Sequence, residues 1–107
     1  MEFESFSQGL KYILNTFGKE VLLDIQKING YLYDYLPAFK RERRMFKLMT
    51  KVQGNIIIYK SLQRDVIEKK LLYQEISEKL TKEFFMSKDV IEEIEDILYH
   101  SFIETIE

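Results

Sequence analysis

The stretch that decides the fold is YDYLPAFKRERRMFKLMTKV, residues 33–52. It contains Pro37, the only proline of the chain. Proline has no N–H to donate and is costly inside a helix, yet it fits the first helical position. It also pushes the preceding residue toward extended backbone. We therefore expect one helix to end at Leu36 and the next to begin at Pro37.

Two faces are expected on this second helix. The apolar face recurs at helical spacing and consists of Met45, Leu48, Met49 and Val52. Lys40, Arg44, Lys47 and Lys51 recur at helical spacing on a different face. Residues 38–51 together hold six basic residues and one acid, Glu42, which gives a net charge of +5. A solvated surface is the simpler interpretation of these charges. The alternative is a docking surface for an acidic partner.

The composition indicates a helical protein. A chain of 107 residues suits a single domain, 1–107. One proline and four glycines leave few breaks, which favours helices over a many-turned β-fold. No cysteine is present, so no disulfide or thiolate metal site is expected.

The acidic start (Met-Glu-Phe-Glu-Ser) does not resemble a secretory signal, and no apolar run approaches the ~20 residues of a membrane span. We expect a cytoplasmic protein that does not contact membranes.

Further apolar periodicities predict an all-α fold, a compact bundle of five or six helices. Ser5 or Ser7, Asp24 and Ser87 are the expected N-caps, and Gly18 is expected to end or bend the first helix. The predicted apolar faces are Phe6, Leu10, Ile13, Leu14 and Phe17; Ile25, Ile28, Leu32 and Tyr35; Leu72, Ile76, Leu80 and Phe84; and Val90, Ile91, Ile94, Ile97, Leu98, Phe102 and Ile106.

Two short segments also carry signals for sheet. Asn29–Gly30 is a known hairpin turn pair, but its flanks do not alternate polar and apolar residues, so we predict a helix there. Ile56–Tyr59 is rich in β-branched residues, which favour strands. It has no convincing partner strand, so we predict a short buried helix over 55–63.

Aromatic residues beside the basic segment suggest a contact surface. Tyr31, Tyr33 and Tyr35 alternate before Pro37, so on a helix at least one of them should be exposed. Tyrosine is enriched in interfaces, although a rim of the core is the simpler interpretation. The predicted partner-binding residues are Lys40, Arg41, Arg43, Arg44, Lys47 and Lys51, together with Tyr31 and Tyr33.

The acidic end of the chain is the third candidate surface. Residues 75–107 hold ten acids against three bases, a net charge of −7. This segment could complement the basic helix within the monomer, pair with it between subunits, or meet a different partner.

Signatures of catalysis are missing from the sequence. His100 is the only histidine, so a Cys–His pair or a histidine-rich metal site cannot be built. The glycines are too dispersed for a phosphate-binding loop. We expect no catalytic residue, no cofactor and no metal.

A non-catalytic domain that binds a protein partner, with possible self-association, is the preferred hypothesis. The alternative is a nucleic-acid-binding regulator that uses the basic helix 38–51. It is less favoured, because the chain has a net charge of −2 and Ile56–Tyr59 is too apolar for a recognition helix.

Two motifs resemble a small all-α accessory domain that recurs in bacterial multidomain proteins, for example at the C-terminus of Hsp70-like ATPases. They are FGKEVLLD at 17–24 and DYLPAFKRE at 34–42, and the resemblance covers about residues 8–102. The chain departs from the pattern at Ile25, at Phe85–Met86 and in a last helix without tryptophan. The resemblance implies an adaptor or regulatory domain without catalysis.

Overall fold

The computed structural model describes residues 2–104, and over this range its regular structure is entirely helical. This confirms the predicted all-α fold and the predicted number of helices. The helices are α1 (Phe6–Phe17), α2 (Ile25–Tyr35), α3 (Lys40–Thr50), α4 (Gly54–Ser61), α5 (Val66–Phe84) and α6 (Lys88–Leu98), with a 3₁₀ turn η1 (Lys19–Leu23) and a π-helical turn η2 (Tyr99–Ile103).

Side-chain caps fix the starts of four helices. The Ser5 hydroxyl accepts from the Gln8 N–H at 3.1 Å, and Asp24 and Ser87 accept in the same way from residues three positions later. The caps at Asp24 and Ser87 were predicted from the sequence, and Ser5 was one of two predicted alternatives, the other being Ser7. Asp65 caps α5 by accepting from the Glu68 N–H at 2.8 Å. Each bond satisfies an N–H that has no partner within its own helix.

The start of α3 differs from the prediction. The preceding helix ends before Leu36, as expected, but Pro37 is not the first residue of the next helix, because α3 begins at Lys40. The Phe39 N–H donates to the Leu36 carbonyl at 3.2 Å and closes a turn across the proline. This turn brings the Phe39 ring edge-on to Phe6, with 6.5 Å between ring centroids. Packing of Phe39 thus delays the helix by three residues.

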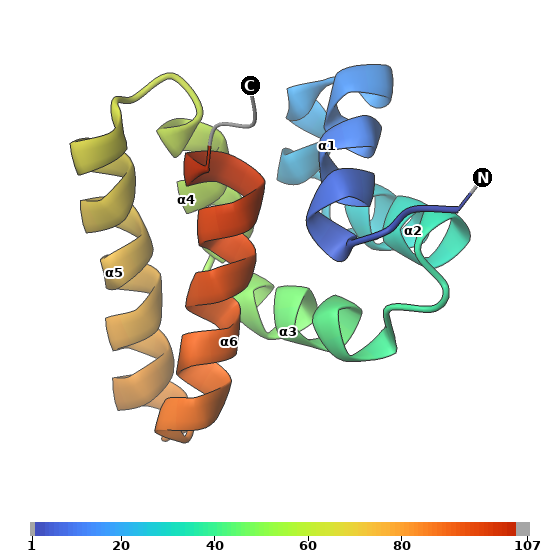
Figure 1. The fold of residues 1–107 in the computed structure, drawn as a ribbon. Coiled ribbons are helices and arrows are strands. Elements are labelled where there is room, and N and C mark those ends of the chain that lie inside the picture. Colours follow the sequence, from blue (N-terminus) through green and yellow to red (C-terminus); the bar gives the residue numbers. More distant parts are fainter. Residues whose placement is uncertain (1, 105–107) are drawn as a thin grey trace.

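The third helix connects two halves of the bundle (Figure 1). Helices α1 and α2 lie on one side of it, and α5 and α6 run side by side on the other. Helix α4 packs against η1, α3 and α5. The segment 55–63, predicted as a short buried helix, falls on α4, and Asn29–Gly30 lies within α2.

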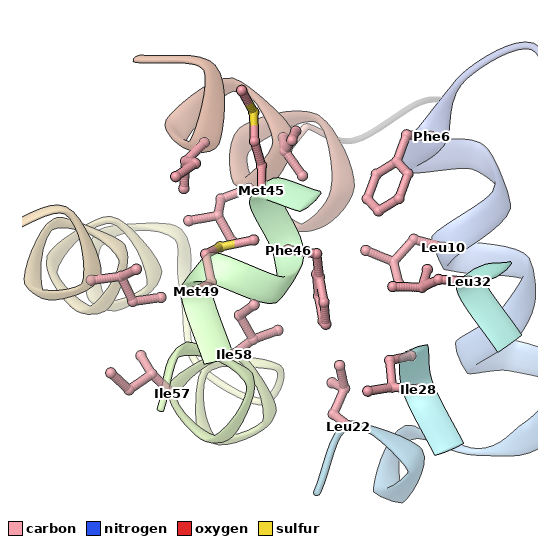
Figure 2. Close-up of a cluster of buried hydrophobic side chains, with 14 of the residues drawn as sticks. Phe6, Leu10, Leu22, Ile28, Leu32, Met45, Phe46, Met49, Ile57 and Ile58 are labelled. Atoms are coloured by element: carbon pink, nitrogen blue, oxygen red, sulfur yellow. The ribbon is translucent and has the colours of Figure 1, made fainter. Parts of the chain in front are cut away.

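Phe46 lies at the centre of the core. Its side chain is fully buried, and its ring points from α3 toward Leu10 and Ile28 (Figure 2). The predicted apolar face of α3 is otherwise correct for Met45 and Met49, while Val52 is buried just beyond the helix. The sequence pattern missed Phe46, because it lies one residue from a stripe that already satisfied the helical period.

Some predicted core residues lie at the edge instead. Phe17, Ile25 and Phe84 are 39%, 45% and 42% exposed. Each is the first or last residue of its helix, where packing covers only one side.

The last α-helix, α6, ends at Leu98, and the chain continues as η2. Ile106, which was predicted on that helix, lies outside the described residues.

Between residues 2 and 104, none of the helices combines the length and apolar character that crossing a lipid bilayer requires.

Candidate functional site

The basic side chains of α3 divide into two groups. Three of them contact neighbouring elements of the fold. The other three line an open groove between α2 and α3. The first group is Arg41, Arg43 and Lys51, and the second is Lys40, Arg44 and Lys47.

Arg41 joins α3 to the acidic helix α6. Its guanidinium donates two hydrogen bonds to the Glu93 carboxylate, and the Nε–Oε2 distance is 2.7 Å. This bidentate contact raises the pKa of Arg41. The carboxylate occupies the donors of Arg41, so this side chain is a link within the molecule. The predicted complementarity of the basic helix and the acidic C-terminal region is therefore met in part inside the monomer.

Arg43 holds the end of α2. Its Nε and one terminal nitrogen donate to the carbonyls of Leu36 and Pro37, at 3.1 and 3.2 Å. These carbonyls follow the last turn of α2, where backbone acceptors lack helical partners. The same guanidinium lies over the Tyr33 ring, 5.2 Å from its centroid. Arg43 thus fixes one wall of the groove.

Lys51 is directed toward the end of α5. Its Nζ lies 5.9 Å from the centroid of the Phe84 ring at the end of α5. It is absent from the lining of the groove, so the structure separates Lys51 from the other predicted partner-binding bases.

The groove between α2 and α3 is open, with a volume of about 320 Å³. Lys40, Arg44 and Lys47 lie on its α3 side at successive helical turns, and all three are exposed. Among residues 2–104, no carboxylate lies within ion-pair distance of any of them. Asn29, Gly30, Leu32, Tyr33 and Arg43 complete the lining.

Tyr33 and Tyr31 have different surroundings. Tyr33 lines the groove and is 65% exposed, the exposure expected of at least one of these tyrosines. Tyr31 is stacked on Phe17 of α1, with 4.1 Å between centroids and an angle of 8° between the rings. Tyr35 touches both rings. Tyr31 therefore packs α1 against α2 and does not share a surface with the basic groove.

The groove combines exposed cations on its α3 side with the exposed ring of Tyr33. Three cations that form no ion pair with any residue in the range 2–104 favour a ligand that carries several negative charges. Tyr33, held by Arg43, offers contact area with little loss of conformational entropy on binding. Helical spacing predicted a shared face for Lys40, Arg44, Lys47 and Lys51, and the structure brings the first three of them together in the groove. The internal contacts of Arg41 and Arg43 could not be predicted, because they depend on what the neighbouring elements place opposite.

His100 contacts a carboxylate on the surface of the molecule. Its Nδ1 lies 2.9 Å from Oε2 of Glu104, one turn later in the chain. Over residues 2–104, no group of three or more histidine, aspartate or glutamate side chains is arranged to hold a metal ion.

No protein-family model, curated protein or solved structure matches the chain. The resemblance to bacterial accessory domains remains an expectation from the two motifs, and the candidate site rests on the geometry described above.

Proposed function

We propose that this protein is a non-catalytic recognition domain that binds an acidic segment of a partner protein in the groove between α2 and α3. The observation that carries this proposal is the set of three exposed cations, Lys40, Arg44 and Lys47, none of which forms an ion pair with another described residue. Other bases of the same helix are used inside the fold. Binding by complementary charge would make association fast and dependent on salt.

Nucleic acid is the alternative ligand for the same groove. A row of cations beside an exposed tyrosine could contact phosphates and stack on a base. However, α3 and α4 do not form a helix-turn-helix reader, because Ile57 and Ile58 of α4 are buried in the core. A nucleic acid would have to bind through phosphate contacts and a stacked base, without a recognition helix that reads a groove, and the chain carries a net charge of −2.

The test is a charge reversal that leaves the fold intact. We expect the variant Lys40→Glu/Arg44→Glu/Lys47→Glu to weaken binding of a fluorescent peptide rich in aspartate and glutamate about tenfold or more. Arg43 is left unchanged because it holds the end of α2. The matched control is Lys19→Glu/Lys27→Glu/Lys60→Glu, which alters net charge equally at exposed sites outside the groove.

A single-stranded oligonucleotide of equal length and charge provides the second arm. Loss of peptide binding in the groove variant, with binding retained in the control, supports the proposal. Preference for the oligonucleotide favours the alternative, and equal losses in both variants would reject a specific groove. Affinity capture from a native lysate with wild type and the two variants then identifies the partner.

A further inference from the structure

Phe85 combines a strained backbone conformation with an exposed aromatic side chain. It follows α5 in the left-handed region, at φ 52° and ψ 38°, and is 86% exposed. Glycine usually occupies this position after a helix, because a side chain is strained there. An aromatic ring exposed to solvent contributes little hydrophobic stabilisation, so within the monomer it does not offset this strain. A contact outside the monomer would account for it.

An apolar patch occupies the other end of the same helix. Ile67 and Leu71, one turn apart, are 72% and 63% exposed. The line they begin continues through Gln74, Glu78 and Lys82, opposite the buried Tyr73, Ile76 and Leu80. Phe85 follows the last residue of α5, about five helical turns after Ile67. Gln74, Glu78 and Lys82 are exposed as well, and helix α5 lies at the edge of the bundle, at the left of Figure 1.

We propose that two copies of the chain associate through α5, antiparallel and related by a two-fold axis near Ser77 and Glu78. Reversing the helix about this point places Phe85 of each copy against Ile67 and Leu71 of the other. One patch of surface is then complementary to itself, as a two-fold interface requires. This interface lies apart from the groove between α2 and α3 and does not depend on it.

The charges beside this line fit the same arrangement. Glu75 and Lys79 lie on one side of it and form an ion pair within the helix at 3.8 Å. The two-fold reversal places Glu75 of one copy opposite Lys79 of the other, so the attraction is repeated across the interface. A parallel arrangement would bring Phe85 onto Phe85 and each charge onto its equal.

Glu78 sets the strength of the association. It lies on the apolar line next to the proposed axis, so the two Glu78 carboxylates approach each other. Repulsion between like charges should keep the dimer weak. Glu78→Gln removes this repulsion, and we expect it to lower the dimer dissociation constant several-fold.

Sedimentation equilibrium of the whole chain tests the contact. We expect wild type to dimerise, and Phe85→Gly to raise the dissociation constant about tenfold, since buried aromatic anchors dominate interfaces. The same glycine should raise the melting temperature at a dilution where only monomer exists, which separates a lost contact from misfolding. Ile67→Ser/Leu71→Ser should weaken association to a similar degree. A chain that stays monomeric at millimolar concentration would overturn the proposal.

Crosslinking tests the register, because the chain has no cysteine of its own. With a short thiol-reactive crosslinker, Glu78→Cys should join to itself, and Ile67→Cys should join to Phe85→Cys only when the two are mixed. The control is Glu92→Cys, exposed on α6. Equal crosslinking of the control would reject this interface. So would a monomeric wild type whose Phe85 is needed to bind lipid vesicles or an unrelated protein.

Discussion

A buried hydroxyl pair is the most constrained polar contact at the scale of single residues. Tyr73 and Ser61 place their oxygens 2.6 Å apart in the core, and Ser61 also donates to the Ile58 carbonyl at 2.6 Å. Burial raises the pKa of Tyr73 to about 12, and the hydrogen bond with Ser61 opposes part of this rise. A buried phenol resists ionisation because its anion would lose hydration.

The raised pKa of Tyr73 predicts a loss of stability in alkali. Above about pH 10 the unfolded chain releases the phenol proton, whereas the folded chain retains it up to about pH 12. The free energy of unfolding should therefore fall by about 1.4 kcal/mol per pH unit in this window, and be unaffected by Tyr73 below it. Urea unfolding between pH 8 and 12 measures the slope.

Tyr73→Phe is the control for that slope. It should cost about 1 kcal/mol at neutral pH, because one buried hydrogen bond is lost while Ser61 keeps its carbonyl partner. It should also unfold with a shallower alkaline slope than wild type. Equal slopes for the two proteins would show that Tyr73 does not ionise differently in the folded state.

Arg43 and Arg44 show the limit of sequence reasoning at this scale. They are adjacent and chemically identical, and both were predicted to bind a partner. Arg43 instead donates to Leu36 and Pro37, whereas Arg44 faces the groove. The difference arises from the turn that ends α2, whose geometry depends on the packing of Phe39. No local pattern encodes that contact.

At the scale of elements, α1 crosses close to the end of α2 because Gly9 has no side chain. A Cβ at Gly9 would lie 2.2 Å from Cδ2 of Leu36, which is buried. A Cβ at Gly30, in the middle of α2, would have no atom within 4 Å. The two glycines are therefore a matched pair, one required by packing and one not.

The pair predicts opposite effects of the same substitution. Gly9→Ala should destabilise by about 1–2 kcal/mol, because overpacking outweighs the gain in helix propensity. Gly30→Ala should stabilise by about 0.5–1 kcal/mol, because alanine loses less backbone entropy in a helix. Thermal unfolding followed by circular dichroism compares them. Stabilisation by both alanines would mean that Leu36 moves aside freely.

The elements themselves were largely predictable, and their ends less so. Caps at Ser5, Asp24 and Ser87 act over three residues, so the sequence alone located these starts. The start of α3 at Lys40 and the end of α6 at Leu98 were not predicted. The first depends on Phe39 meeting Phe6, a contact between residues far apart in the chain.

For the whole molecule, α3 has two roles on two faces. Its inner face inserts Phe46 between the two halves of the bundle, while its outer face presents the basic groove. The groove therefore keeps its shape only while the core is packed around Phe46. The all-α class followed from apolar periodicity, but the central residue did not, because the stripe of Met45, Leu48, Met49 and Val52 satisfied the helical period without Phe46.

Replacing Phe46 tests whether the two halves fold as one unit. Phe46→Ala should cost about 3–5 kcal/mol, a large part of the 5–15 kcal/mol typical of a whole domain. Phe17→Ala, at the partly exposed Phe17–Tyr31 stack, should cost about 1–2 kcal/mol. If Phe46 joins the halves, hydrogen exchange in Phe46→Ala should speed up equally in α1 and α6. Faster exchange confined to α1 and α2 would instead show that α5 and α6 fold without them, and that the groove rests on the first half alone.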